Sequence, residues 1–350
     1  MEVMSGRQFF LDRGVGETRG VVTLEGRPER LLIQRDGDIP ALQLGARNVA
    51  RVRSLEKAIG VAFLDLPGGV EALYSLRTDE TPPVRGATIE VEIRTEARQD
   101  KLATVKLIGP AEGEPRLLQA AMDVEAEIRD LAKGGKVVEG FGAREAADAA
   151  EAEALDVVHP LPGGGSMAIE PTRALVSIDV DLGGRPGSDT KRAARLANLT
   201  AIGAAARLLR LKGLGGLVVF DFVGRGHDGK ALLGAARAAF GPDNPGVAID
   251  QISRFGTLTL TVPRRRRPVL ELLTDGAGAL TPLTMALRLA RRLEREGRAD
   301  PGGRLTAGCA PAVLEAFAGL RAGVTDKLGA RFTVEAKPGW PVDRLEVAAT

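Results

Sequence analysis

Residues 174–182, ALVSIDVDL, are an apolar run of strand length that carries a carboxylate, Asp179, close to its end. Residues 214–222, LGGLVVFDF, repeat this pattern with Asp221 in a similar place. Between the two runs the sequence predicts a long helix over about residues 189–212. Strands and helices that alternate at this spacing favour a layered α/β domain.

The two aspartates are the clearest anomaly of the sequence, because they lie in runs that otherwise read as hydrophobic core. A buried carboxylate without a partner is costly, so a compensating group is expected. A hydrated divalent cation would serve, since Mg²⁺ is typically held by one or two carboxylates and water, and strand ends in α/β sheets are the usual place for sites. The alternative is that Asp179 and Asp221 cap loops or pair with arginines, and composition does not decide between the two.

The alternating pattern continues around these runs. Further strands are expected at 167–171, 247–253 and 257–263, with a helix near 229–240. We therefore expect an α/β unit over residues 161–275. Residues 276–350 follow it as a small α+β domain, with a helix across 282–296.

Residues 47–110 contain five strand-sized runs separated by turns, namely VARVRSL, GVAFLDL, EALYSL, TIEVEIRT and LATVKLI. Five such strands favour a small closed barrel of the OB type. Phe63 and Tyr74 interleave there with basic side chains, Lys101 among them. Aromatic residues beside basic ones suit single-stranded nucleic acid, because every base has a face on which to stack. Packing in the core is the alternative for Phe63.

Two further segments complete the predicted architecture. Residues 1–46 indicate a strand meander, with the runs QFFLD, GVVTL and RLLIQ separated by glycine-rich turns. Residues 111–160 are rich in alanine and glutamate and indicate a connector of one or two amphipathic helices. The sequence thus predicts an α/β multidomain protein with an OB-type barrel, a layered α/β domain and a small α+β domain.

The composition limits the kinds of metal site and disulfide that the chain can form. A length of 350 residues with 44% hydrophobic and 27% charged residues is typical of a soluble protein of two to three domains. A single cysteine, Cys309, excludes intrachain disulfides and zinc sites with two or more thiolates. Two histidines exclude a histidine-rich metal cluster, so any metal must be held by carboxylates.

The balance of 48 basic against 46 acidic residues does not by itself indicate nucleic acid as a partner. The sequence begins without an apolar run of signal-peptide length, and its longest apolar stretch, 214–223, is interrupted by Asp221. We therefore expect a cytoplasmic protein that does not enter a membrane.

Four consecutive arginines, Arg264 to Arg267, follow the strand expected at 257–263. Adjacent guanidinium groups repel one another unless an anion attends them, so a phosphate track is one interpretation. In that interpretation Arg264 and Arg265 contact RNA. A solvated loop is the other interpretation.

Three stretches together resemble the ribonuclease E/G family of endoribonucleases. Residues 163–184, 198–222 and 249–261 carry a Gly-Gly turn, an acidic strand motif, a helix leading into a LGG element, a second strand ending in FDF, and ISRFG. The order and spacing are similar to those of the family. The resemblance implies a DNase I-like nuclease domain in which Asp179 and Asp221 are catalytic and bind Mg²⁺.

The resemblance also implies roles for neighbouring residues. The family commonly has asparagine two positions after the first aspartate, where this chain has Asp181, a third candidate metal ligand. Ser253, Arg254 and Phe255 match the ISRFG element, and Asn198 matches an NL helix element. These residues are expected to support the site or to contact RNA, and Arg254 is a candidate RNA-binding residue.

The barrel is similar to the RNA-binding OB module of the family. Phe63 falls at its first stacking phenylalanine and Lys101 at a basic residue that contacts RNA. Where the family has a second phenylalanine, this chain has Leu73 followed by Tyr74, so that stacking there is expected to be weaker or shifted.

Two departures from the family are expected to change its properties. The connector 111–160 is a reduced insert, too short for the pocket that senses a 5′-monophosphate in the larger members. Residues 271–280, ELLTDGAGAL, lack the thiolate pair that binds zinc between subunits. We therefore expect no zinc, and any homo-oligomer would form without a zinc link.

The combined expectation is a Mg²⁺-dependent endoribonuclease that cleaves single-stranded RNA to 5′-phosphate and 3′-hydroxyl ends without sensing a 5′-monophosphate. The residues do not distinguish Mg²⁺ from Mn²⁺. One alternative is a non-catalytic RNA-binding protein built on a nuclease scaffold. Another is a nuclease directed at DNA.

Overall fold

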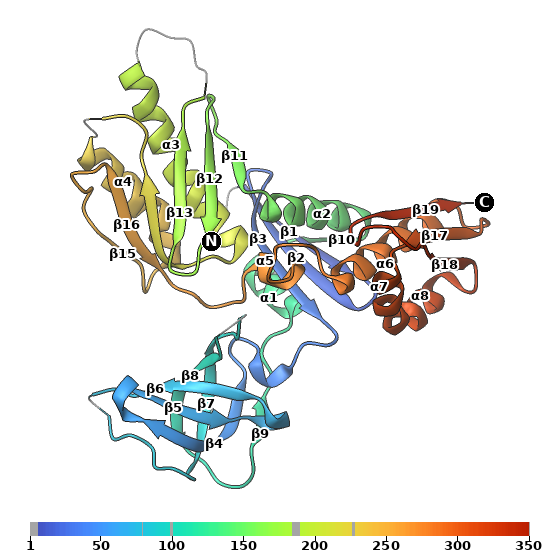
Figure 1. Ribbon diagram of the computed structural model, residues 1–350, viewed down its shortest axis with the longest axis horizontal. Coiled ribbons are helices and arrows are strands. Elements are labelled where there is room, and N and C mark those ends of the chain that lie inside the picture. The colour runs from blue at the N-terminus through green and yellow to red at the C-terminus, as the bar shows by residue number, and fades with distance from the viewer. Residues whose placement is uncertain (1–5, 79, 99–100, 184–189, 226–227, 350) are drawn as a thin grey trace.

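The computed structural model describes residues 6–78, 80–98, 101–183, 190–225 and 228–349. These residues contain four β-sheets, whose arrangement Figure 1 shows. One sheet forms a barrel at the bottom of the view, apart from the others, and the C-terminal helices and strands lie at the right. Within these ranges no helix is both long and apolar enough to cross a lipid bilayer.

Five strands close into the barrel that the sequence predicts. They are β4 (Arg47–Glu56), β5 (Val61–Asp65), β6 (Glu71–Ser75), β7 (Thr88–Thr95) and β8 (Ala103–Pro110). They follow the order β5-β6-β8-β7-β4, and a further pairing of β5 with β4 closes the ring. A short strand, β9 (Arg116–Gln119), also pairs with β4. Alternate side chains such as Ala62 and Leu64 are fully buried, as the two-residue period of a strand requires.

A six-stranded sheet forms the centre of the α/β unit. Its strands are β11 (Val158–Pro160), β12 (Ser166–Pro171), β13 (Val176–Asp181), β14 (Gly216–Asp221), β15 (Ala248–Ile249) and β16 (Thr257–Val262). The spatial order is β11-β12-β13-β14-β16-β15. Only β13 and β14 pair in parallel within it, since the crossover between them contains a helix, α3 (Thr190–Lys212).

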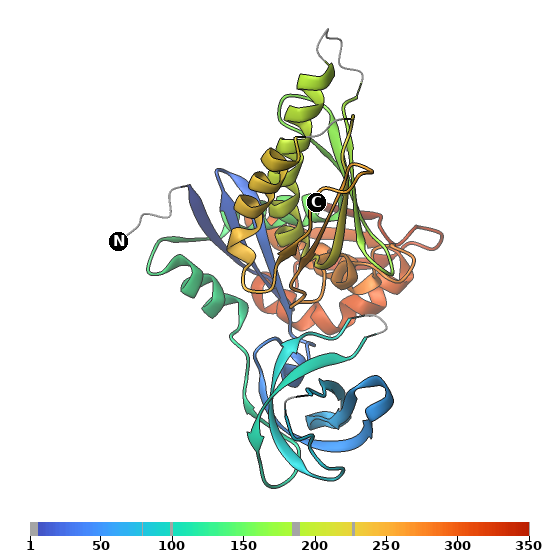
Figure 2. The same ribbon diagram turned by 90° about the vertical axis from the view of Figure 1, so that its left-hand side faces the viewer.

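The helices of this unit lie on one side of the sheet. Figure 2 shows α3 and α4 (Gly229–Phe240) beside each other on the same side of the strands. Ile178, Phe220 and Leu258 point to that side and are completely buried against alanine-rich turns of α3. This confirms a mixed α/β unit with a hydrophobic core under α3, whereas its DNase I-like layering remains a prediction.

The strand meander and the connector share one sheet. Strands β1 (Arg7–Arg13), β2 (Glu17–Leu24) and β3 (Arg27–Arg35) form a meander, and β10 (Val137–Glu139) pairs in parallel with β1. Two connector helices, α1 (Val124–Ala132) and α2 (Phe141–Leu155), contact this sheet. The connector therefore completes the N-terminal sheet as well as linking two domains.

Helix α1 is fixed at its start and along one face. The Asp123 side chain accepts a hydrogen bond from the Ala126 amide at 2.7 Å and so caps the helix. Val124 and Ile128 then pack over Gly20 of β2. A Cβ at Gly20 would lie 2.4 Å from a carbon of Ile128, so the close approach of α1 to the sheet requires glycine.

The C-terminal residues form an α+β arrangement. Its elements are α6 (Pro282–Ala299), β17 (Leu305–Cys309), α7 (Pro311–Phe317), α8 (Arg321–Leu328), β18 (Phe332–Ala336) and β19 (Leu345–Ala349). The three strands follow the order β18-β17-β19. A short helix, α5 (Val269–Leu273), lies between β16 and this part of the chain. The helix predicted across 282–296 is confirmed as α6.

Buried ion pairs join the N-terminal sheet, α2 and α6. The carboxylate of Glu151, on α2, accepts hydrogen bonds from Arg19 at 3.0 Å, Arg288 at 2.7 Å and Arg291 at 3.3 Å. Burial alone would raise the pKa of Glu151, but Arg291, Arg288 and Arg19 outweigh it, so the pKa lies below its ordinary value. Glu151 is therefore charged at neutral pH and holds three elements together.

Another buried arginine extends these contacts. Arg144 of α2 donates to Asp12 of β1 at 3.1 Å and to Glu294 of α6 at 3.1 Å. Its side chain and both partners are less than a tenth exposed. Breaking a buried ion pair by removing one partner leaves a charge without compensation in a dry environment.

We predict that Glu151→Gln lowers the free energy of unfolding by about 3–5 kcal/mol, because three guanidinium groups then lose their shared anion. Urea unfolding at neutral pH measures the change. Because the pKa of Glu151 is lower in the folded protein than its ordinary 4.5, this contribution is present above about pH 4.5 and is lost as the pH falls through the lowered value.

Glu145→Gln, at an exposed position of α2, is the matched control and is expected to change the free energy of unfolding by less than about 0.5 kcal/mol. Equal effects of the two substitutions would show that the buried contacts are not important for stability.

Candidate functional site

The two aspartates lie directly opposite each other on neighbouring strands. In the parallel pairing of β13 with β14, Asp179 is the register partner of Asp221. Register partners present their side chains on the same face of a sheet, and adjacent strands are about 4.8 Å apart. The two carboxylates are therefore side by side and within reach of a single cation.

The expectation that these carboxylates are buried is wrong. Asp179 and Asp221 are both exposed, whereas the alternate residues Ile178 and Phe220 are completely buried under α3. The physical reason is that helices cover only one face of the sheet, so the strands alternate between a core face and a solvated face. The two negative charges still require a compensating group, because like charges directly opposite each other in a sheet are destabilising.

Asp181 lies two residues farther along the same face of β13, opposite Ser166. Its Oδ1 accepts a hydrogen bond from the Gly183 amide at 3.1 Å, which closes the turn after the strand. Over the described ranges of the chain, no three His, Cys, Asp or Glu side chains are grouped so that they could hold a metal ion. The arrangement thus brings two carboxylates together and does not support Asp181 as a third ligand.

Asn198 of α3 holds the backbone that follows Asp221. Its Nδ2 donates to the Val223 carbonyl at 3.0 Å, and its Oδ1 accepts from the Val223 amide at 3.1 Å. The side chain is 1% exposed, so of the two roles expected for it, only support of the site is compatible with the structure. Asn198 is a positioning residue for the end of β14.

The ISRFG turn leads into β16 beside the aspartate pair. Thr257, the first residue of β16, is the register partner of Asp221. Ser253 and Thr257 hydroxyls lie 2.7 Å apart, and the Phe255 and Thr257 amides both donate to the Ser253 hydroxyl. Arg254 and Phe255 are exposed at the tip, with the guanidinium carbon 4.7 Å from the ring centroid.

A cavity of about 610 Å³ opens where β13 and β14 end. It lies between α3 and α4 and is lined by Leu182, Asn198 and Val223. Basic side chains of Lys191, Arg195 and Arg225 also line it. One of them, Arg195, pairs with Asp228, the N-cap of α4, at 3.2 Å.

The arginine run lies at the other end of the sheet. Val262 of β16 is the register partner of Gly216, the first residue of β14, and the arginines follow that end. Arg264 donates to the Gly215 carbonyl at 2.7 Å. Arg266 pairs with Glu127 and Glu96, and Arg267 pairs with Asp38.

These contacts correct the interpretation of the run as a continuous phosphate track. Three of its four side chains bind other parts of the chain, and the Glu96 amide at the end of β7 donates to the Arg265 carbonyl at 2.8 Å. The side chain of Arg265 is exposed, and its contact with RNA stays a prediction. The run therefore fastens the barrel to the α/β unit.

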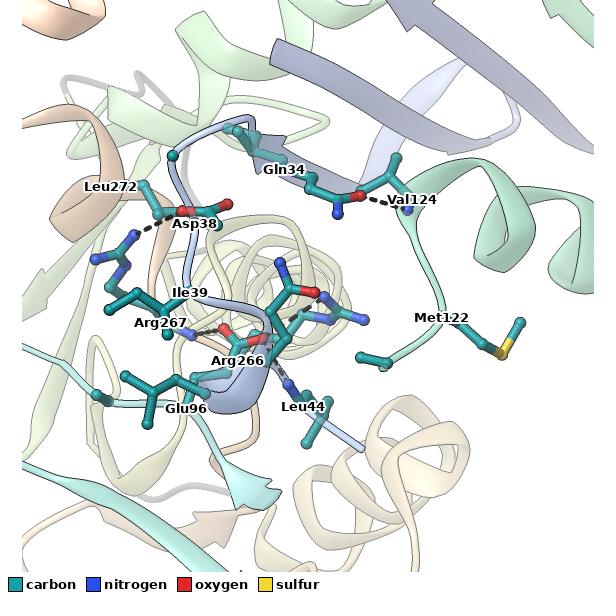
Figure 3. Close-up of a pocket in the computed structure, with 16 residues that line it drawn as sticks. Gln34, Asp38, Ile39, Leu44, Glu96, Met122, Val124, Arg266, Arg267 and Leu272 are labelled. Atoms are coloured by element: carbon teal, nitrogen blue, oxygen red, sulfur yellow. Dashed lines mark hydrogen bonds and ion pairs between the residues drawn. The ribbon is translucent and has the colours of Figure 1, made fainter. Parts of the chain in front are cut away.

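A cavity of about 250 Å³ lies in this seam, and Figure 3 shows the residues that line it. The Glu96 carboxylate accepts hydrogen bonds from the Arg267 amide at 2.9 Å and from the Leu44 amide at 3.2 Å. On the opposite wall, the Gln34 side chain accepts from the Val124 amide at 3.1 Å. The residues around this cavity join the barrel to the rest of the chain, and two of them, Arg266 and Arg267, follow the end of β16 that is opposite the aspartate pair.

Of the two candidate aromatic residues in the barrel, Phe63 faces outward and Tyr74 faces inward. Phe63 is half-buried on the outer surface, with the Arg53 guanidinium carbon 5.7 Å from its ring centroid. Tyr74 is only 5% exposed and packs in the barrel core, so the prediction that it stacks on a base is wrong. Leu73 is the register partner of Phe63, which places Tyr74 on the inward face of β6. Lys101 is exposed at the turn between β7 and β8.

Part of the chain is similar in sequence to known ribonucleases. Residues 116–267 match the sequence model of the Ribonuclease E/G family. The chain is 39% identical over 107 residues to Ribonuclease E of Haemophilus influenzae, a match that covers 30% of this chain and 11% of that protein. It is 38% identical over 107 residues to Ribonuclease E of Escherichia coli, covering 30% and 10%.

A longer match extends beyond this segment. The chain is 26% identical over 208 residues to Ribonuclease G of Salmonella typhimurium, covering 55% of this chain and 42% of that protein. In all three cases the matched part spans less than half of the relative's own length.

We predict that Asn198→Ala lowers the free energy of unfolding by about 1–3 kcal/mol for each Val223 backbone group that loses its partner. Urea unfolding and hydrogen exchange at the Val223 amide measure the effect. Thr200→Ala, which removes an exposed hydroxyl that donates to the Leu196 carbonyl within α3, is the matched control. Unchanged exchange at Val223 in Asn198→Ala would contradict the positioning role.

Proposed function

Because residues 116–267 match the sequence model of the Ribonuclease E/G family, we propose that this chain is a member of that family and a Mg²⁺-dependent endoribonuclease that cleaves single-stranded RNA. The observation that supports this proposal most strongly is the placement of Asp179 opposite Asp221 on a solvated sheet face. The products are RNA ends with a 5′-phosphate and a 3′-hydroxyl. Cleavage does not depend on a 5′-monophosphate.

The aspartate pair fits Mg²⁺ in number and kind of ligands. Mg²⁺ takes oxygen ligands, usually one or two carboxylates, and keeps several waters, for which the exposed pair leaves room. A divalent cation also relieves the repulsion between the two adjacent charges. When bound, Mg²⁺ supplies positive charge that polarises a phosphate and lowers the pKa of water. Mn²⁺ accepts the same ligands.

The surrounding residues have separate tasks in this proposal. Asn198 keeps the backbone after Asp221 in one conformation. Arg254 lies on the neighbouring turn with an exposed guanidinium, a group well suited to a phosphate. In the barrel, Phe63 stacks on a base and Lys101 contacts the RNA backbone.

We predict that Asp179→Asn and Asp221→Asn each lower the rate of RNA cleavage more than about 100-fold, because even residues that only orient a metal ligand contribute about 10- to 100-fold. A single-stranded RNA that becomes fluorescent when cut, incubated with Mg²⁺ and then with EDTA, measures the rate. Asp343→Asn, at an exposed position of the C-terminal domain, is the matched control and should cut like the wild type.

The same assay separates the alternatives. A wild-type protein that binds the RNA but cuts no faster than Asp179→Asn would be a non-catalytic RNA-binding protein. Equal cutting of a DNA oligonucleotide of the same sequence would indicate a nuclease without preference for RNA.

We predict that Phe63→Ala weakens binding of single-stranded RNA about 5- to 150-fold, the equivalent of about 1–3 kcal/mol for one stacked base. Fluorescence anisotropy in EDTA measures the dissociation constant without cleavage. Phe63→Trp keeps a stacking face and should bind like the wild type. Tyr74→Phe should also bind normally, because that ring lies in the barrel core. Unchanged affinity in Phe63→Ala would remove the barrel face from the proposal.

A further inference from the structure

Phe255 is a bare aromatic ring at the edge of the sheet that carries the aspartates. Its side chain is 76% exposed, more than any other large hydrophobic side chain in the described part of the chain. The remaining phenylalanines near the site, Phe220 and Phe222, are at most 5% exposed. Scattered exposed hydrophobic residues are common, so the argument depends on how this ring is held and where it lies.

The turn that carries Phe255 is tightly bonded. The Ser253 amide donates to the Thr257 carbonyl at 2.9 Å, and the Gly256 amide donates to the Ser253 carbonyl at 3.0 Å. The Phe255 amide donates to the Ser253 hydroxyl at 3.2 Å. Gly256 is buried with a φ of +85°, a conformation that favours glycine. The ring is thus presented by an ordered turn, so that little freedom is lost when something binds to it.

The position of the turn is set by strand register. Thr257 pairs with Asp221, and Asp221 pairs with Asp179, so the three residues form a row across β16, β14 and β13. Phe255 precedes this row by two residues. The turn that carries Phe255 therefore lies next to the aspartate pair, at the end of the sheet opposite the barrel and the arginine run.

Arg254, the residue before Phe255, adds a positive charge beside the aromatic ring. The Arg254 guanidinium carbon is 4.7 Å from the ring centroid, within the range of a cation–π contact. Phe255 is 76% exposed even with the guanidinium over its ring. An exposed aromatic ring beside a positive charge is complementary to a nucleotide, whose base stacks while its phosphate contacts the cation.

We propose that Phe255 and Arg254 form a subsite that stacks the nucleobase next to the phosphate at the Asp179–Asp221 pair. This inference rests on the proposed function, because it takes single-stranded RNA as the ligand. Stacking on a phenyl ring accepts every base, so the subsite orients the chain at the cleavage point with little sequence preference. This subsite is separate from the Phe63 surface of the barrel. An RNA strand that binds at both places is held at two points.

The test uses a short single-stranded RNA made with a fluorescent adenine analogue at each position in turn, whose emission is quenched by stacking. Binding is measured in EDTA, so that no cleavage occurs. For the wild type we expect quenching at one position that depends on Phe255. Phe255→Ala is expected to remove that quenching and to weaken binding about 5- to 150-fold, whereas Phe255→Trp retains both. Phe63→Ala should remove quenching at a different position.

Phe141→Ala is the matched control, since Phe141 is 61% exposed and begins α2, a helix that contacts the N-terminal sheet. It should bind and quench like the wild type. The inference is overturned if Phe255→Ala binds and quenches like the wild type, or if Phe141→Ala reduces binding as much. In the first case exposure of Phe255 would instead point to a protein partner.

The two proposals fail in different ways. If the wild type shows quenching that depends on Phe255 but does not cut the RNA with Mg²⁺, the nuclease function fails and the stacking subsite stands. If the wild type cuts and Phe255→Ala binds and cuts equally well, only the subsite fails. Unfolding midpoints of all variants, compared with the wild type, ensure that a loss of binding does not come from a loss of fold.

Discussion

The parallel register between β13 and β14 is the constraint on which the site depends. It places Asp179 beside Asp221, and it is enforced from the other side of the sheet, where Ile178 and Phe220 are buried under α3. A shift of one residue would turn a carboxylate toward the core and a large apolar side chain toward water. Hydrophobic packing therefore holds the two like charges together, although they repel each other.

Ionic contacts attach the other parts of the chain to this sheet. Around Glu151, three arginines from β2 and α6 meet one carboxylate in the interior. At the seam with the barrel, Glu96 binds the Arg266 side chain and the Arg267 amide. A chain with 3% aromatic residues thus uses arginine and carboxylate pairs at its domain contacts. Such pairs fix geometry at a cost in desolvation, and they are not interchangeable with hydrophobic contacts.

Much of the fold could be predicted from the periodicity of apolar residues. The wrong predictions concern features that this periodicity does not encode. Five apolar runs were enough to predict the barrel, and strands alternating with helices predicted the α/β unit, whereas the parallel pairing of β13 with β14 came from the structure. Alternation within ALVSIDVDL did not reveal that one face is left without a helix, so Asp179 was expected inside the core. The alternation of side chains on β6 directs Tyr74 into the barrel core. The resemblance to the RNA-binding OB module had instead favoured a stacking role for this residue.

Contacts between residues that are distant in the chain also could not be predicted from the sequence. β10 has only three residues and takes its strand conformation from pairing with β1, so no local pattern indicates it. The arginine run gives no sign that Glu127, Asp38 and the Gly215 carbonyl are its partners. Asn198 and Phe255 were noticed by resemblance, but their roles depend on burial and exposure, which only the folded chain determines.

The attachment of the barrel has a consequence for the length of RNA that the proposed nuclease would need. The barrel is fastened near Gly216, where β14 begins, and the aspartate pair lies where β14 ends. Five residue steps of about 3.3 Å separate the two ends, or about 17 Å. In the proposed function, an RNA bound by the barrel and cut at the aspartate pair would have to span this length of the sheet. An RNA fragment too short to span it would not be held at both places.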